Sequence, residues 1–303
     1  MKRLAREQMS MYLFVAPLLI WWLIFGLYPL IENYRITLYD TNSVLETGYY
    51  VGLGNFRRVI TDPVFWRTFG NSFKYSIFQV PIQLSIALLL ALTLNLPWVR
   101  AKSVLRTMFF VPCLMSMTLL GMVISLMLNP YDGVFNQILM KLHLISKPID
   151  WLGDERYAFP TIIGLGIWQT LGFNLVYFLA ALQSIPRELY EASEIDGVSG
   201  WHQLIYITLP LIAPVGLLIL ILAVIGSLNV FELVLVTTGG GPACSTEVVQ
   251  TYIYKLAFAS GANQQIGYAT AAALFMSIMI LGLTGLQILA VNRMRRTRRE
   301  NGV

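Results

Sequence analysis

Long apolar runs restrict the fold of this 303-residue chain more than any other feature of its sequence. A helix needs about 20 mostly apolar residues to cross the hydrocarbon core of a bilayer. Runs of this length form helices because backbone groups in lipid must be satisfied within the segment, whereas a β-barrel would show short alternating segments. The sequence predicts an all-α membrane protein, a single domain over residues 1–303, with six transmembrane helices at about 11–31, 70–94, 103–128, 160–182, 205–236 and 265–291.

Composition and the two ends of the chain agree with this class. Hydrophobic residues make up 56% of the chain and charged residues 12%, whereas soluble domains carry about a quarter charged residues. The start is basic and then apolar, but the apolar run is too long for a signal peptide and no small-residue cleavage site follows. Much of the net charge of +5 lies in the tail NRMRRTRRENGV, residues 292–303, which is typical of a topology signal and not of nucleic-acid binding.

The distribution of lysine and arginine predicts the orientation in the membrane. Twelve of them fall in segments that lie inside if the N-terminus is cytoplasmic, and nine fall in the outside loops. The inside group is packed close to the ends of the spans, where basic residues set topology most strongly. We therefore expect both termini in the cytoplasm, with the segment between the fourth and fifth spans on the same side.

Six prolines fall within the expected spans. A proline removes a backbone donor and tends to kink a helix, although membrane helices tolerate proline and ordinary bundle packing is the alternative. Six together favour a bundle that bends and opens; they are Pro17, Pro29, Pro81, Pro112, Pro210 and Pro214.

Cysteine and histidine give no sign of a metal or catalytic centre. The chain has two of each, Cys113, Cys244, His143 and His202, all isolated and without metal-ligand spacing. A membrane-embedded enzyme would need a catalytic cluster, and this sequence offers none. We expect no metal site, no cofactor and no disulfide in this chain.

The stretch ELYEASEIDGVSGWHQLIYITLP, residues 188–210, interrupts the apolar pattern with four acids among its first nine residues. Good helix formers run from Arg187 to Ile195, and Gly197 suits a left-handed stop. Ser199 is placed to begin a second helix that leads into the fifth span. The sequence predicts a helix–turn–helix at about residues 184–204.

One face of the first of these helices has the character of a docking surface. Leu189, Ala192, Ser193 and Asp196 share that face at helical spacing, and two of them are small enough for another surface to approach the backbone. Glu188 and Glu191 flank it. The residues alone leave two interpretations equally open, a plug for a socket on a cytoplasmic partner and a solvated loop helix.

This stretch resembles the EAA motif of ATP-binding-cassette importer permeases. That motif reads E-A-A, two residues, D-G, and after a fixed gap I-x-L-P. Here the matching residues are Glu191, Ala192, Ser193, Asp196, Gly197, Ile207, Leu209 and Pro210, with Ser193 in place of the second alanine.

Further segments are similar to sugar permeases of the maltose and glycerol-phosphate style. They are VGLGNFRRVITDPVFW (51–66), ALQSIPRELYEAS (181–193), FELVLVTTGGGPACSTEVVQTYIYKLAF (231–258) and IGYATAAALFM (266–276). The resemblance covers nearly the whole chain. It implies the type I importer permease fold, with a cytoplasmic coupling helix between the fourth and fifth spans.

The resemblance also implies partners, because no G-x-x-x-x-G-K-[ST] phosphate-binding loop occurs in this chain. We expect a non-catalytic subunit in the cytoplasmic membrane of a prokaryote, paired with a second, homologous permease subunit. ATP and Mg²⁺ would bind two cytoplasmic ATPase subunits, and an extracytoplasmic solute-binding protein would deliver a carbohydrate, an oligosaccharide being expected. The residues expected at the ATPase are Glu188, Glu191, Ala192, Ser193, Asp196 and Gly197.

Uncharged polar and aromatic residues within the spans are candidates for the sugar path, because sugars bind through hydroxyl hydrogen bonds and ring stacking. For each residue the alternative is a contact between helices. Glu232 is an ionisable residue near the end of a span, and ionisable residues within spans are functional candidates by default. The candidates are Trp168, Gln169, Thr170, Phe173 and Asn174 in the fourth span and Ser227, Asn229 and Glu232 in the fifth.

The glycine-rich loop of Gly239, Gly240, Gly241 and Pro242 is a candidate contact for the solute-binding protein, with turn formation alone as the equal alternative.

Other cargoes and other classes remain as alternatives. Alternative cargoes of the same type of importer are a glycerol-phosphate, a polyol and an amino sugar, although no span holds a lysine or arginine away from its ends, which disfavours an anion. A channel or secondary carrier would need inverted repeats and ionisable groups at mid-membrane, and neither is evident.

Overall fold

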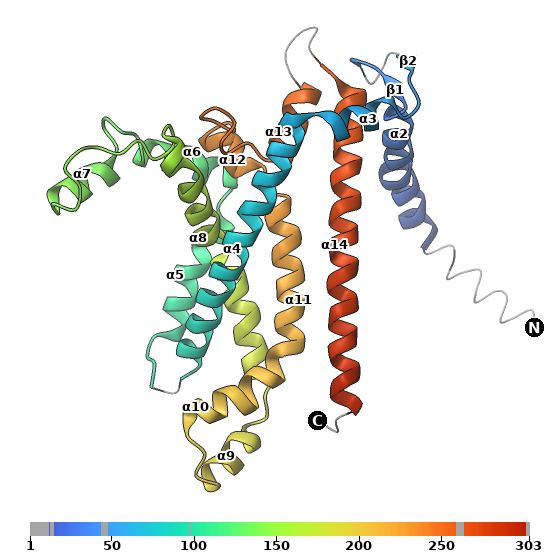
Figure 1. Cartoon of the computed structure of the whole chain (residues 1–303). Coiled ribbons are helices and arrows are strands. Elements are labelled where there is room, and N and C mark those ends of the chain that lie inside the picture. Colours follow the sequence, from blue (N-terminus) through green and yellow to red (C-terminus); the bar gives the residue numbers. More distant parts are fainter. Residues whose placement is uncertain (1–11, 13–14, 44–47, 97, 259–263, 301–303) are drawn as a thin grey trace, which may run out of the picture. The chain divides into compact units, whose positions relative to one another are not determined.

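The structure, a computed structural model, describes residue 12 and residues 15–43, 48–96, 98–258 and 264–300, with side chains described up to residue 293. Packing divides the chain into two compact units, residues 1–66 with 252–278 and residues 67–251 with 279–303. The expected single domain remains a prediction. Each unit is described in turn, and Figure 1 labels the helices and strands.

The first unit gathers the start of the chain and part of its C-terminal region. Its own elements are the π-turn η1 (Leu23–Leu27), α2 (Tyr28–Ile36), the antiparallel pair β1 (Tyr39–Asp40) and β2 (Tyr49–Tyr50), and α3 (Gly54–Thr61). It also takes in parts of α13 (Val249–Phe258) and α14 (Ile266–Glu300).

The carboxylate of Asp62 holds this unit together just before α4 (Pro63–Asn95). It accepts hydrogen bonds from the hydroxyl of Tyr252 on α13 at 2.5 Å and from Tyr268 on α14, and from the backbone N–H of Val64 at 2.9 Å. The guanidinium of Arg58 lies over the Tyr268 ring at 4.3 Å. Partial burial opposes ionisation, but these donors outweigh it and hold the pKa of Asp62 below its usual range.

The second unit contains most of the long helices. In chain order they are α4 (Pro63–Asn95), α5 (Lys102–Leu114), α6 (Met117–Met127), α7 (Val134–Lys141), α8 (Glu155–Gln183), α9 (Arg187–Ile195), α10 (Gly200–Gln203), the π-turn η2 (Leu204–Thr208), α11 (Leu209–Leu228) and α12 (Glu232–Thr237).

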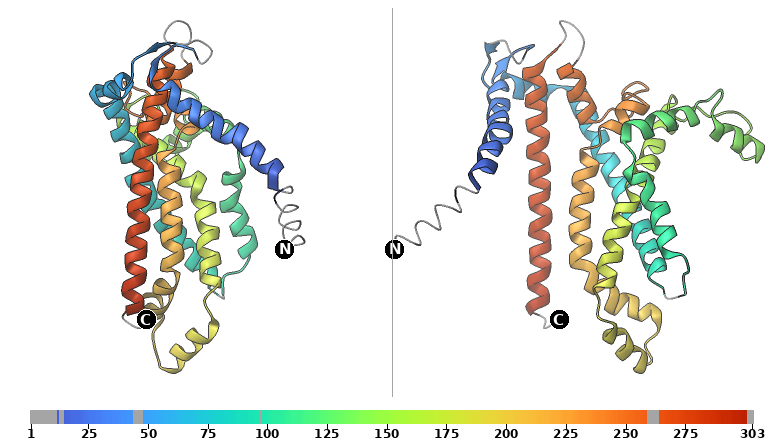
Figure 2. Two further views of the ribbon diagram at one scale, coloured as in Figure 1. Left: turned by 90° about the vertical axis from the view of Figure 1, so that its right-hand side faces the viewer. Right: turned by 180° about the vertical axis from the view of Figure 1, so that it is seen from behind.

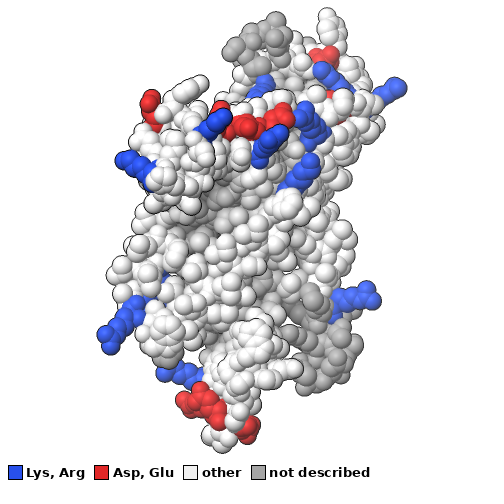
Figure 3. All heavy atoms as spheres, turned by 60° about the vertical axis from the view of Figure 1, so that its left-hand side comes forward, with Lys and Arg blue, Asp and Glu red and all other residues white. Residues whose placement is uncertain are grey.

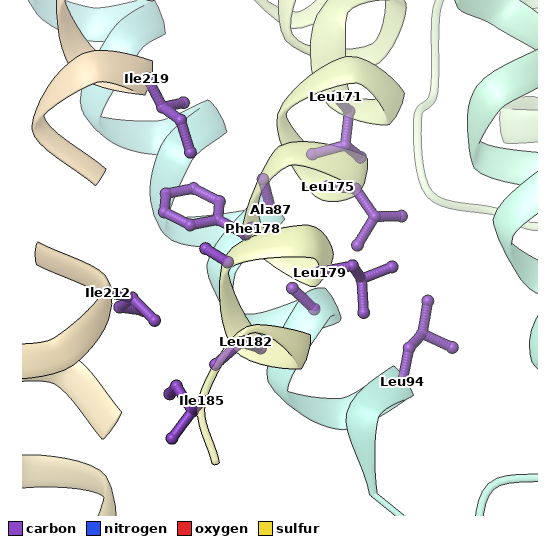
Figure 4. Packing of buried hydrophobic residues seen from close by; sticks show 12 residues of the cluster. Ala87, Leu94, Leu171, Leu175, Phe178, Leu179, Leu182, Ile185, Ile212 and Ile219 are labelled. Carbon is purple, nitrogen blue, oxygen red and sulfur yellow. The ribbon is translucent and has the colours of Figure 1, made fainter. Parts of the chain in front are cut away.

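The core of the second unit lies where α8 packs against α4 and α11, as Figure 4 shows. Leu171, Leu175 and Leu179 recur at four-residue spacing along α8 and are buried. Ala87 of α4 and Ile219 of α11 belong to the same cluster. Small residues bring the helices close, and a Cβ added at Gly172 of α8 would lie 2.4 Å from the carbonyl oxygen of Phe109 on α5.

Five helical stretches are long and apolar enough to cross a membrane, which confirms the all-α membrane fold within the described residues. They are Val15–Ile36, Pro63–Asn95, Glu155–Gln183, Gly200–Thr237 and Ile266–Arg293. The predicted third span at 103–128 corresponds to α5 and α6, a pair bent by 97° that reaches the length and hydropathy of a span only when taken together. Met115 is extended at the break, and Ser116, a residue that favours helix starts over helix interiors, takes the N-cap of α6.

The predicted fifth span also breaks. The regular helix α11 ends at Leu228, and α12 begins only at Glu232. The amide of Asn229 donates back to the carbonyl of Ile225 at 2.8 Å, a local bond that competes with continuation of the helix. Asn229, Val230 and Phe231, which form the break, line a cavity within the second unit.

Four of the six prolines show two different effects. Pro81 and Pro214 lie inside continuous helices. Pro29 and Pro210 each follow a π-turn, in which the residue before the proline donates five residues back instead of four. In an α-helix the proline ring would crowd the carbonyl four residues before it, and the wider turn keeps the helix continuous at this position.

We predict that Asp62→Asn lowers the stability of the folded chain, because the amide replaces charge-assisted bonds from two tyrosines. The expected loss is about 1–2 kcal/mol, measured as a lower midpoint of thermal unfolding in detergent. The pKa of the carboxyl is lowered on folding, so its contribution is complete at neutral pH and disappears as the pH falls through that lowered pKa. The exposed Asp132→Asn is the control, and equal midpoints for wild type and Asp62→Asn at pH 7 would contradict the prediction.

Candidate functional site

A cavity of about 570 Å³ lies within the second unit, between α4, α8 and the broken α11–α12 region. This volume is in the range of small-molecule binding sites. Its lining residues are Tyr75, Gln79, Gln83, Met117, Gly166, Gln169, Thr170, Phe173, Asn174, Tyr177, Leu222, Ala223, Gly226, Ser227, Asn229, Val230, Phe231, Glu232 and Leu233.

The structure brings together seven of the eight residues that the sequence singled out for a sugar path. These are Gln169, Thr170, Phe173, Asn174, Ser227, Asn229 and Glu232. Trp168 is not among the described lining residues, and 45% of its surface is exposed. It stays an untested candidate that this cavity does not include.

Helical spacing along α8 places its polar groups on the cavity side. Thr170 lies one turn after Gly166 and one turn before Asn174, so the three residues form one stripe. The Thr170 hydroxyl lies 2.7 Å from both the Gly166 carbonyl oxygen and Gln83 Oε1, and Asn174 Nδ2 donates to the Thr170 carbonyl at 3.1 Å. These bonds hold the polar stripe in a fixed orientation.

Sequence reasoning missed the contribution of α4. Tyr75, Gln79 and Gln83 line the cavity and are each at most 3% exposed. Their four-residue spacing inside an apolar span was the signal that could have found them. Gly166 permits the close approach of α4 and α8, since a Cβ there would lie 2.0 Å from the Tyr75 hydroxyl.

The cavity is lined by both apolar and polar groups and is nearly uncharged. Amides, hydroxyls and aromatic rings supply its hydrogen-bonding and stacking groups, and Glu232 is the only charged side chain among the described lining residues. The described residues contain no cluster of three or more His, Cys, Asp or Glu side chains that could hold a metal ion. The arrangement suits binding of an uncharged, hydroxyl-rich molecule.

The acidic segment folds as the sequence predicted, and the views in Figure 2 place α9 and α10 beyond the ends of α8 and α11. At the end of α9, Val198 N–H bonds to the Ser193 carbonyl at 2.9 Å and Gly197 N–H bonds to the Glu194 carbonyl at 3.0 Å. With Gly197 at φ +72°, these two bonds form a Schellman motif.

The expected docking face of α9 divides into an inner and an outer part. Ser193 is buried against the chain itself, where its hydroxyl accepts a bond from Gln203 Nε2 at 3.0 Å and donates to the Tyr190 carbonyl at 2.7 Å. The Tyr190 hydroxyl in turn lies 2.8 Å from the hydroxyl of Thr208. The small side chain at Ser193 therefore allows α9 to pack on the following segment, and not on an outside surface.

The outer part of α9 is fully available to a partner. Acidic side chains gather at the lower end of the face drawn in Figure 3, where the acids of α9 lie. Sequence reasoning missed Ile195, which is 88% exposed beside these acids. The exposed residues of the expected docking set are Glu188, Glu191, Ala192, Asp196 and Gly197.

The glycine-rich loop is built by turn geometry. Gly239 and Gly240 have φ of +57° and +89°, which other residues rarely adopt. The Thr246 hydroxyl donates to the Gly241 carbonyl at 2.6 Å, and Asn71 Nδ2 of α4 donates to the Cys244 and Glu247 carbonyls at 3.2 and 3.0 Å. These contacts account for the glycines without a partner, and a contact with a binding protein stays a prediction.

Comparisons with known proteins agree over most of the chain. The family model described as "binding-protein-dependent transport system inner membrane component" matches residues 11–296. The lactose transport system permease protein of Rhizobium radiobacter is 37% identical over 92% of this chain and 93% of its own length. The trehalose/maltose transport system permease protein of Thermococcus litoralis is 34% identical over 96% of both chains.

A solved structure has the same fold. It is a bacterial alginate ATP-binding-cassette transporter in complex with a periplasmic protein that holds an alginate pentasaccharide. One of its chains superposes with a TM-score of 0.80 at 26% identity, over 98% of this chain and 96% of that chain. With its several apolar helices, this chain belongs to the family of binding-protein-dependent transport system inner membrane components, the non-catalytic permease subunits of ATP-binding-cassette importers, whose ATPase is a separate subunit.

Proposed function

We propose that this subunit moves an uncharged oligosaccharide across the cytoplasmic membrane through the cavity between α4, α8 and α11, by alternating access. The observation that carries the proposal is the lining of that cavity, which combines amides, hydroxyls and aromatic rings with a single carboxylate. Such groups bind sugar hydroxyls and ring faces and offer no counter-ion to an anion.

The named relatives support a sugar cargo. They are permeases for lactose and for trehalose and maltose, which are uncharged disaccharides. The solved transporter takes alginate, an acidic polysaccharide, so its fold alone does not fix the charge of the cargo. In this chain the described lining residues include a carboxylate and no lysine or arginine, which argues against glycerol-phosphate and leaves polyols and amino sugars as further cargoes.

The energy would enter through α9. An ATPase subunit on the cytoplasmic side would bind ATP and Mg²⁺ and grip the exposed acids and Ile195 of α9. Salt bridges from Glu188 and Glu191 to basic residues of that subunit would orient the contact, and burial of Ile195 would strengthen it. The Schellman motif and the Ser193–Gln203 bond join α9 to α10, so a movement of α9 imposed by the ATPase would be passed on to α10.

The complete importer would contain four membrane-associated subunits. A second, homologous permease would pair with this chain, and two ATPase subunits would dock beneath the pair. An extracytoplasmic binding protein would deliver the sugar, as the complex with a periplasmic protein exists for the alginate transporter. Both termini would lie in the cytoplasm, as the basic tail indicates.

Transport by the reconstituted importer tests the proposed cargo. The proteoliposomes contain this chain with its partner permease, ATPases and binding protein. We expect them to take up labelled lactose, trehalose or maltose only when ATP is present on the side of the membrane where the ATPases lie. Omission of ATP is the control. Uptake of none of these sugars, or uptake of alginate oligosaccharides alone, would overturn the neutral-oligosaccharide proposal.

Substitutions in α9 test the coupling. We expect Glu191→Ala and Gly197→Asp each to reduce ATP-driven uptake by about tenfold or more, because the first removes a docking charge and the second forces a side chain into a left-handed turn. Membrane insertion should be unchanged. Co-purification of the ATPase with each variant measures the docking directly.

The matched control is Glu155→Ala, which removes an exposed acid from the first turn of α8 instead. It should leave uptake and ATPase co-purification at the wild-type level. Wild-type uptake in both α9 variants would rule out the coupling role of this segment.

A further inference from the structure

We propose that α7 is an interfacial helix, whose apolar face lies in the boundary between the lipid headgroups and the acyl chains of the bilayer. The helix belongs to the connection between α6 and α8, at the end of the second unit opposite to α9 (Figure 1). The partner of this face is a lipid surface. The inference goes beyond the proposed function and does not depend on the cargo.

The helix α7 has two faces, and its apolar face points away from the rest of the chain. Val134, Ile138 and the C-cap residue Leu142 follow one another at four-residue spacing, so they share one side. Between 49% and 61% of each is exposed, and Phe135 beside them is exposed as well. On the opposite side Asn136 is buried. Such a continuous apolar face is unfavourable in water and indicates a contact with lipid or with another molecule.

Internal hydrogen bonds hold α7 in this orientation. Asn136 Nδ2 donates to the Ile149 carbonyl at 2.9 Å, and Asn136 Oδ1 accepts from the indole N–H of Trp151, also at 2.9 Å. Trp151 in turn packs against the buried cluster that includes Leu120 of α6. The connection between α6 and α8 is therefore an ordered lobe, and the exposure of the apolar face of α7 is a property of its fold.

The path of the chain brings α7 to the side of the bundle and close to hydrocarbon. The preceding helix α6 contains no charged residue, and α7 begins soon after α6 ends. The following helix α8 is long and apolar enough to span the membrane. The views of Figures 1 and 2 agree that α7 projects sideways from the second unit. A helix in this position meets the lipid beside the bundle unless another subunit lies there.

The side chains around α7 have the composition of a membrane–water boundary. Tyr131 is exposed just before the helix, and the rings of Phe135, Trp151 and Tyr157 meet edge to face at 5.3 and 5.8 Å. Tryptophan and tyrosine concentrate at the level of the headgroups. Lys141 is exposed at the polar edge of the helix, where a long basic side chain reaches lipid phosphates. These features favour lipid over a soluble protein as the partner.

An anchored α7 would hold the adjoining ends of α6 and α8 at a constant depth in the membrane. Trp151 contacts both helices, because the cluster that it joins also includes Leu165 of α8. The lobe therefore links the lipid boundary to two helices of the second unit, one of which lines the cavity.

Spin-label accessibility tests the inference in the assembled importer, reconstituted in vesicles of phosphatidylcholine and phosphatidylglycerol. A nitroxide is attached at Ile138→Cys on the apolar face. Gln137→Cys is the matched control, since Gln137 is the preceding residue and is exposed at the polar edge. Cys244→Ser is present throughout, and the parent without an added cysteine gives the background from the buried Cys113.

Collision rates of the nitroxide are measured with oxygen, which concentrates among acyl chains, and with a nickel chelate, which stays in water. Because an interfacial helix buries its apolar side below the headgroups, we expect the ratio of the oxygen rate to the nickel rate to be about threefold or more higher at residue 138 than at residue 137.

A second pair of variants tests whether the apolar face itself holds the helix in the boundary. The nitroxide is moved to Val134→Cys, and Ile138→Asp or Ile138→Leu is added. The aspartate should lower the ratio at residue 134 to that of the residue 137 label, because a carboxylate is costly among acyl chains. The leucine should leave the ratio unchanged.

Three outcomes at residue 138 would each overturn the inference. Frequent collisions with the nickel chelate would place the face in water. Few collisions with either reagent would mean that protein, such as the second permease, covers it. Loss of nickel collisions only after the binding protein is added would make it a docking site for that protein. None of these readings uses sugar uptake, so the inference and the proposed function can fail independently.

Discussion

Every polar side chain buried in a membrane-spanning helix needs a partner, and α4 shows how this requirement organises the second unit. Four polar residues along this helix bond to three other segments, and Asn71 and Ser72 share one of them, residues 244–249. Asn71 holds the carbonyls of the loop after α12, Ser72 accepts the N–H of Val249 at 3.0 Å, and Ser76 meets α11. Gln83 meets α8. These bonds place three separate segments around one helix, and the cavity is the space left between them.

The sequence predicted the class, the helical spans and the helix–turn–helix because each depends on local chemistry. Span length follows from bilayer thickness, and the end of α9 follows from Gly197. The breaks at Ser116 and Asn229 were not predicted, because hydropathy averages over single polar residues that end a helix. At Asn229 the break coincides with a side-chain bond to the Ile225 carbonyl, which an apolar run does not show.

The candidate site was predictable for α8 and α11 and missed for α4. The sequence reasoning looked for polar residues within spans four and five, and seven of those residues do surround one cavity. The stripe of Tyr75, Gln79 and Gln83 has helical spacing, but spacing alone does not tell a helix contact from a cavity wall. Likewise, the role of Ser193 as an internal contact depends on Gln203, which lies ten residues later and comes close only through the turn.

The π-turn η2 lies between the acidic helices and α11, and it contains one residue more than an α-helical path of the same length requires. Each residue in a regular helix turns the chain by about 100°. Loss of one residue from an ordinary helix at this point would therefore rotate every later side chain away from its partner. Within Leu204–Thr208 the same loss would convert the π-turn to α geometry, and the side chains of α11 would keep their orientation relative to α10. This short segment is thus where the chain can change its length by one residue without moving Ser227 relative to Glu191.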